Sequence, residues 1–108
     1  MNALSQQATS RQQEIINLMK TVFEIHREEL RNLRIILFGS RVDGTAQDRS
    51  DFDIGILPQG ELDIRTKFFI EDLLEELPTL LKFDVVNLDT APNRFRQRAL
   101  RQYEVIFE

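Results

Sequence analysis

Residues 37–56, LFGSRVDGTAQDRSDFDIGI, carry the strongest structural signal in this 108-residue chain. In its second half, apolar residues at positions 52, 54 and 56 alternate with Asp51 and Asp53. In a β-strand this alternation places both carboxylates on one face and the apolar side chains on the other, against a core. Two hard oxygen ligands side by side on a rigid strand suit Mg²⁺, so the pattern predicts a metal site.

A Gly-Ser pair stands ten residues before the acidic strand and directly after the apolar run Ile35–Phe38. We expect that run to be a buried strand, followed by a sharp turn and a short helix after Ser40. The free N–H groups of a helix start, next to the bare Gly39, favour a phosphate, and the Ser40 hydroxyl and Arg41 guanidinium add donors. A phosphate site beside a divalent-metal site is what phosphoryl and nucleotidyl transfer require.

A third carboxylate, Asp84, stands alone in the apolar run Phe83–Leu88, whose β-branched residues are typical of a strand. A lone buried carboxylate is costly, so Asp84 either lies at a solvated strand end, caps a local group, or joins Asp51 and Asp53 around a metal. We favour the last interpretation. The alternative for Asp51 and Asp53 is an exposed acidic edge that discourages strand aggregation.

Hydrophobic periodicity and turn residues predict an alternation of helices and strands. The expected elements are a helix over 11–31 with Ser10 as its N-cap, strand 35–38, a short helix, strand 52–57, helix 62–77 ended by Pro78, strand 83–88, helix 92–101 and strand 103–107. This order predicts an α/β (α+β) sandwich, with a small mixed sheet and helices packed mainly on one face. We expect a single domain over residues 1–108, with residues 1–10 disordered.

Composition narrows the function classes. No apolar run approaches the roughly 20 residues that span a bilayer, and Met1–Ser10 lacks the pattern of a secretory signal. The absence of cysteine excludes disulfides, thiolate zinc sites and cysteine nucleophiles, and fits a cytoplasmic protein. The net charge of -4 argues against nucleic acid as the main partner.

Charge is unevenly distributed along the chain. The segment Glu61–Leu77 is acidic, whereas Asn93–Gln102 carries four arginines and no acid. This basic segment either contacts a nucleotide or an acidic partner, or is a solvated helix face whose arginines pair with the acidic helix.

Together these motifs resemble a minimal nucleotidyltransferase of the DNA polymerase beta superfamily. The resemblance covers nearly the whole chain: an apolar strand that ends in Gly39-Ser40, about a dozen residues, the Asp51-Phe52-Asp53 strand, and a later strand with Asp84. Relatives often carry a basic residue where this chain has Asp43. That acid either weakens triphosphate binding or serves as a turn residue before Gly44.

The resemblance implies a nucleotidyltransferase-like fold and a role for each motif residue. Asp51 and Asp53 would bind two Mg²⁺ ions that bridge the phosphates of ATP, and Asp84 would complete one metal site and help deprotonate the acceptor hydroxyl. Gly39 and Ser40 would hold the triphosphate, and Arg41 would contact phosphate.

Relatives of this size are commonly paired with a small all-helical HEPN protein, the two acting as antitoxin and toxin in a homo- or hetero-oligomer. The resemblance therefore implies transfer of AMP from ATP to a hydroxyl, a tyrosine, of that partner. An alternative is a noncatalytic nucleotide-binding module or subunit that acts by stable association. A third hypothesis, transfer to a small molecule of the aminoglycoside type, is disfavoured because the chain is too short for an acceptor-binding domain.

Overall fold

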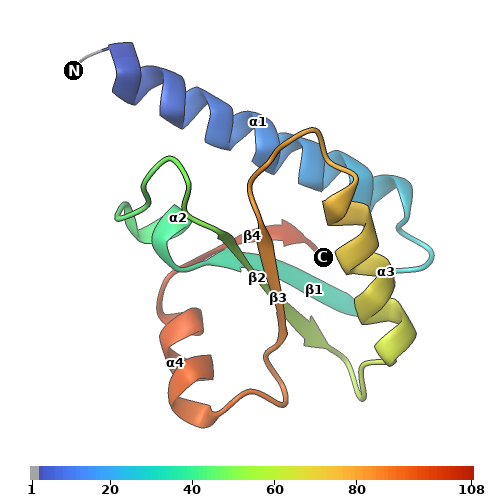
Figure 1. The fold of residues 1–108 in the computed structure, drawn as a ribbon. Coiled ribbons are helices and arrows are strands. Elements are labelled where there is room, and N and C mark those ends of the chain that lie inside the picture. The colour runs from blue at the N-terminus through green and yellow to red at the C-terminus, as the bar shows by residue number, and fades with distance from the viewer. Residues whose placement is uncertain (1–2) are drawn as a thin grey trace.

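The computed structural model describes residues 3–108, with side chains from Arg11 onward. Four helices and four strands alternate along this part of the chain, in the predicted order (Figure 1). Their bounds are α1 Ala3–Ile25, β1 Leu33–Phe38, α2 Ser40–Asp43, β2 Phe52–Pro58, α3 Ile64–Glu75, β3 Phe83–Asn87, α4 Asn93–Arg101 and β4 Tyr103–Phe107.

The strands form one mixed sheet in the order β3-β2-β1-β4, which confirms the predicted sheet type. β1 pairs antiparallel with β2 and β4, whereas β2 and β3 are parallel. Residues 35–38 of the central strand β1 are buried on both faces, since helices cover both sides. A continuous apolar run, without alternation, is the expected sequence for such a strand.

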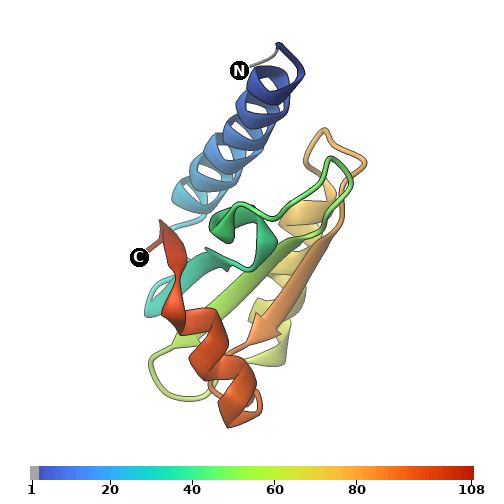
Figure 2. The same cartoon turned by 90° about the vertical axis from the view of Figure 1, so that its left-hand side faces the viewer.

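Helices lie on both faces of the sheet, and the two longest share one face. α1 and α3 cover the face that carries Leu37, Ile54 and Val85, and together they form the larger core. On the other face, α4 packs Ala99 among Ile36 and neighbouring side chains. Figure 2 shows α3 behind the sheet and α4 in front of it. The structure is therefore an α+β sandwich with helices mainly on one face, as predicted.

Helix ends differ from the predicted ones. α1 ends at Ile25, well before residue 31, and Ser10, the expected N-cap, lies inside it. α3 begins at Ile64 because the Asp63 side chain accepts a hydrogen bond from the Arg65 N–H and so caps the helix. The disorder expected for residues 1–10 stays a prediction, since residues 1–2 and the side chains up to position 10 lie outside the described part. No helix within residues 3–108 is long and apolar enough to cross a bilayer.

Candidate active site

Sheet pairing brings the three predicted acids together. Asp53 of β2 is the register partner of Asp84 of β3, and on its other side it faces Phe38 of β1. Paired residues of neighbouring strands point to the same face, about 4.8 Å apart, so both carboxylates project on the face that α4 covers. Asp51 lies just before β2, two residues from Asp53. A carboxylate cluster thus forms where β2 and β3 begin.

The other two acids lie close enough to Asp53 to affect the pKa of its carboxyl group. Asp53 is partly buried, whereas Asp51 and Asp84 are exposed. Burial raises the pKa of the Asp53 carboxyl above its ordinary value, and the charges of Asp84 and then Asp51 raise it further. Carboxylates that stand close together without a cation repel one another, and this repulsion favours the protonated form of one of them. A cation placed among these carboxylates would relieve it.

Gly39 lies directly against the acid cluster. Its backbone has φ 77° and ψ -150°, a conformation that residues other than glycine rarely adopt. A Cβ atom here would stand 2.3 Å from the Asp53 Oδ2 and 3.2 Å from its Cγ. The glycine is therefore required both by the turn and by the close approach of the carboxylate. The Gly39 carbonyl accepts hydrogen bonds from the N–H groups of Val42 and Asp43. These bonds begin α2, whose first residue is Ser40.

Arg41 donates its hydrogen bonds to protein groups. Its guanidinium bonds the carbonyl oxygens of Ser50 and Asp48 and the side chain of Gln12, and it packs over the Phe52 ring. Burial lowers the pKa of this guanidinium, with Asp48 and Asp51 opposing the shift. The side chain expected at the phosphate thus holds the loop before β2.

Asp43 is a turn residue. Its carboxylate accepts hydrogen bonds from the backbone N–H and the hydroxyl of Thr45, and these bonds lower its pKa. Gly44 follows in the left-handed conformation, φ 86°. Of the two interpretations left open by the sequence, the structure supports the local one.

The donor set of the cluster suits a hard cation, because it consists of carboxylates alone. Across residues 3–108, however, no three acidic, histidine or cysteine side chains already stand in an arrangement that would hold a metal ion. Exposed side chains change rotamer on the nanosecond scale, and Asp51 and Asp84 are exposed. The residues present therefore fit Mg²⁺ by the chemistry of their donor atoms, which are carboxylate oxygens.

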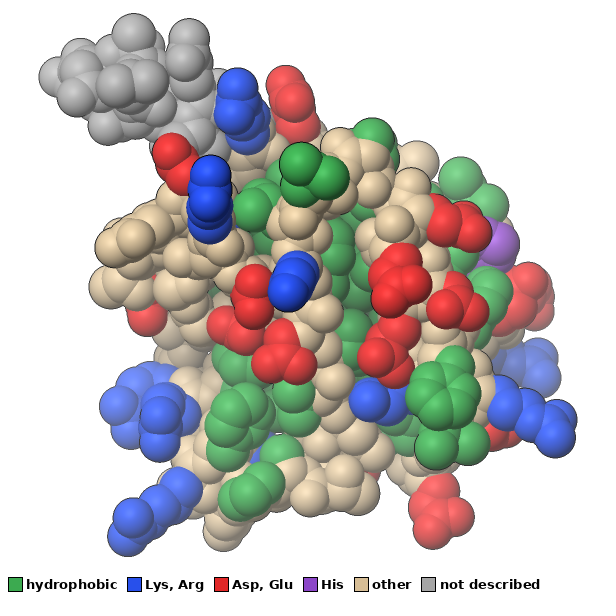
Figure 3. Space-filling model, viewed as in Figure 1, with side chains coloured by type: hydrophobic (Ala, Val, Ile, Leu, Met, Phe, Trp, Pro, Cys, Tyr) green, Lys and Arg blue, Asp and Glu red, His purple; other side chains and the backbone are tan. Residues whose placement is uncertain are grey.

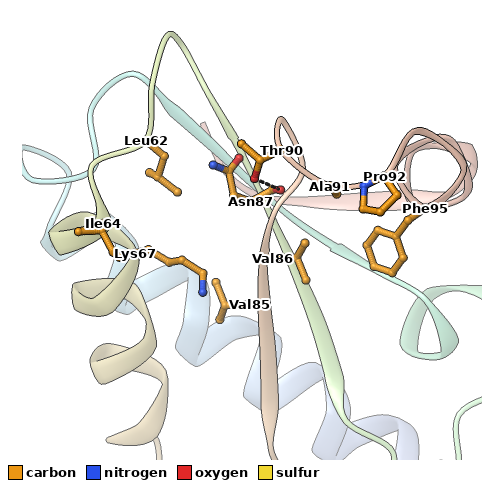
Figure 4. A pocket seen from close by; sticks show the side chains of 10 residues that line it. All are labelled: Leu62, Ile64, Lys67, Val85, Val86, Asn87, Thr90, Ala91, Pro92 and Phe95. Carbon is orange, nitrogen blue, oxygen red and sulfur yellow. Dashed lines mark hydrogen bonds between the residues drawn. The ribbon is translucent and has the colours of Figure 1, made fainter.

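A separate pocket of about 560 Å³ lies at the other end of β3 (Figure 4). It is largely apolar, with Val85 and Val86 on the two sides of β3 and Ile64 and Phe95 at opposite ends. None of the predicted site residues lines it. The sequence carried no signal for this pocket, because its walls come from α3, β3 and the start of α4.

Charged side chains also gather in patches. On the face seen in Figure 3, acidic side chains lie over β2 and β3 and over α3, and basic ones lie over α4. α3 and α4 are on opposite faces of the sheet, so the arginines of α4 do not pair with the acidic helix. Among the described ion pairs, α4 contributes one, from Arg96 to Asp89 at 3.9 Å. The pairing considered for the basic segment is therefore not found.

Known proteins share this architecture. The family model described as "Polymerase beta, Nucleotidyltransferase" matches residues 13–108. A toxin-antitoxin structure determined with AMP-PNP is 26% identical, with a TM-score of 0.65, over 85% of this chain and 72% of the other. A complex of the tri-AMPylated Shewanella oneidensis HEPN toxin with its MNT antitoxin also shows 26% identity, with a TM-score of 0.60 over 89% and 71%.

A search of proteins with curated functions found no match. The family model, by contrast, spans the Gly39-Ser40 turn and all three acids of the cluster. Its match covers most of the chain, and the mixed sheet agrees with the fold of the solved structures. The chain therefore belongs to the polymerase beta nucleotidyltransferase family.

Proposed function

We propose that this chain is a Mg²⁺-dependent nucleotidyltransferase that transfers AMP from ATP to a hydroxyl group of a protein partner. The partner would be a small helical HEPN-type toxin, which the chain neutralises as an antitoxin. The observation that carries the proposal is the pairing of Asp53 with Asp84, with Asp53 against Gly39 and Asp51 two residues before it. Two similar structures support it, one determined with AMP-PNP and one holding an AMPylated HEPN toxin.

Each residue of the cluster has a defined task in this proposal. Asp51, Asp53 and Asp84 would hold two Mg²⁺ ions, which neutralise phosphate charge when bound. Gly39 and Ser40 would hold the triphosphate, through the backbone N–H groups of the turn and the Ser40 hydroxyl. Contact between Arg41 and phosphate stays a prediction.

The transfer itself is a displacement at the α-phosphorus of ATP. The acceptor hydroxyl oxygen forms a bond to that phosphorus, and the bond from phosphorus to the oxygen bridging to the β-phosphate breaks. Pyrophosphate leaves with the electron pair of that bond. The hydroxyl proton passes to the Asp84 carboxylate, which is exposed and so within reach of an acceptor from outside.

The test is intact-mass spectrometry of the protein encoded by the neighbouring reading frame after incubation with this chain, ATP and Mg²⁺. We expect an added AMP that is lost with Asp53→Ala and retained with Asp72→Ala, which removes an exposed acid from α3. An unmodified neighbour that nevertheless co-elutes with the chain would refute the transferase proposal for that acceptor.

A noncatalytic binding module is the second candidate function. It is favoured by the absence, within the described residues, of three side chains already arranged around a metal ion. In this case the chain would act by stable association with a helical partner. A folded Asp51→Ala, Asp53→Ala double variant would then bind and neutralise the partner as well as the parent chain does. Loss of neutralisation with binding retained would count against this candidate.

A further inference from the structure

The guanidinium of Arg41 is almost fully used by protein acceptors. Nε and Nη2 both donate to the Ser50 carbonyl oxygen, at 3.2 and 2.6 Å. Nη2 also donates to the Asp48 carbonyl at 3.2 Å, and Nη1 donates to the Gln12 Oε1 at 3.3 Å. An arginine side chain has five N–H donors, so one Nη1 donor lacks an acceptor in the described part of the chain. The paired donors that grip a phosphate are therefore engaged elsewhere.

These contacts bracket Asp51 along the backbone. Ser50, whose carbonyl accepts two of the bonds, precedes Asp51, and Phe52, whose ring lies 4.6 Å from the Arg41 Cζ, follows it. Phe52 is fully buried and stacks on Phe83 with ring centres 5.3 Å apart. Arg41 thus contacts the loop residue before Asp51 and the strand residue after it.

Helix α1 holds the arginine in turn. The Gln12 Nε2 donates to the Arg41 carbonyl at 3.0 Å, while the Gln12 Oε1 accepts from the guanidinium. Within the loop, the Ser50 hydroxyl and the Gln47 carbonyl close a turn through bonds of 2.9 and 3.0 Å. Side chain and loop are therefore fixed from two directions before any ligand arrives.

We propose that Arg41 is a positioning residue that fixes the backbone on both sides of Asp51 and so presents this carboxylate to the metal. The inference rests on the proposed role of Asp51 as a Mg²⁺ ligand. Ordering a loop costs conformational entropy, and a loop that is ordered beforehand does not pay it on binding. Gln12 supports the arginine, which couples α1 to the acid cluster.

The direction of the change in Mg²⁺ affinity distinguishes a positioning role of Arg41 from a purely electrostatic one. Loss of a positive charge next to carboxylates would by itself strengthen Mg²⁺ binding. Loss of a positioning residue weakens it, and substitution of groups that orient metal ligands typically costs 10- to 100-fold in affinity. Lysine keeps the charge but offers one compact ammonium, which cannot reach two carbonyls and also cover the Phe52 ring.

The experiment compares Arg41→Ala and Arg41→Lys with Arg49→Ala, a variant that removes an exposed arginine from the same loop. Apparent Mg²⁺ affinity is measured by thermal-shift titration without nucleotide. Amide hydrogen exchange of residues 45–51 is measured in metal-free protein. We expect both Arg41 variants to weaken Mg²⁺ binding by about 10- to 100-fold and to speed exchange in the loop. The Arg49 variant should keep the loop exchange of the parent chain and bind Mg²⁺ no more weakly than the parent chain does, because it loses charge but no positioning contact.

Two results would overturn the inference. In the first, the Arg41 variants keep the Mg²⁺ affinity and loop exchange of the parent chain but bind ATP more weakly, which would make Arg41 a phosphate contact. The other is a loop equally protected from exchange without the arginine. If Mg²⁺ does not change the melting temperature of the parent chain, the proposed function fails. Hydrogen exchange of the loop still tests whether Arg41 fixes the backbone around Asp51. Gln12→Ala, which removes only the α1 partner, replaces Arg41→Ala if the latter does not fold.

Discussion

Replacing Gly39 with alanine tests the close contact at the centre of the site. The backbone there has φ 77° and ψ -150°, a region that is nearly restricted to glycine. A Cβ atom would also stand 2.3 Å from the Asp53 Oδ2, far inside van der Waals contact. The carboxylate must therefore rotate away, and the variant loses both backbone fit and the position of a proposed metal ligand.

The size of the effect follows from these two contributions. Backbone strain of this kind costs about 1–3 kcal/mol. Forcing the Asp53 side chain off its preferred rotamer adds about 0.5–1.5 kcal/mol. We expect Gly39→Ala to lower the free energy of unfolding by about 2–4 kcal/mol. Gly44→Ala is the matched control, because Gly44 has φ 86° but nothing within 4 Å of its Cβ position. Its cost should be about 1–2 kcal/mol, from the left-handed backbone alone.

The assay is urea denaturation of both variants without metal, repeated in an Asp53→Ala background. Removing the carboxylate relieves the clash but not the backbone strain, so Gly39→Ala should cost about 0.5–1.5 kcal/mol less there. Gly44→Ala should cost the same in both backgrounds. Equal costs for the two glycines, with no coupling between Gly39 and Asp53, would mean that the Asp53 carboxylate does not occupy the Cβ position of residue 39.

Two further predictions follow from the acid cluster and the core. The raised pKa of Asp53 stabilises the metal-free fold below the unfolded pKa of about 3.9, and that contribution is lost as pH rises through the folded pKa. Asp53→Asn should remove this pH dependence in urea titrations. It should also remove the stabilisation of about 2.7 kcal/mol expected from Mg²⁺ at a hundredfold excess over its Kd. A variant that keeps either response would contradict the proposed site. In the core, Ile54→Ala should cost about 2–5 kcal/mol by urea denaturation, because Ile54 is fully buried. Ile25→Ala, at a residue that is 71% exposed, should cost under about 0.5 kcal/mol, and similar losses would argue against the assigned core face.

Local sequence signals predicted the elements well and their ends less well. The alternation at Phe52 and Ile54 identified β2, and both side chains lie in the core as expected. The end of α1 was placed too late, because the chain continues in turns with hydrophobic spacing after Ile25 until Leu30 reaches the core. Turn bonds of the i→i+4 type occur there without a continuous helix, and hydrophobic spacing alone does not distinguish the two.

The amino-acid sequence was enough to identify which residues could form the site. The spacing of Gly39 from Asp51 and the alternation around Asp53 are properties of the chain, because a strand has a period of two and glycine alone tolerates the turn. Strand register was decided only in three dimensions: Asp84 reaches Asp53 because β3 pairs in parallel with β2, a pairing between residues distant in sequence. The task of Arg41 was also decided by tertiary contacts, since its acceptors are backbone carbonyls and a glutamine of α1. Hydrogen-bond partners of this kind depend on where the backbone passes, which no residue type encodes on its own.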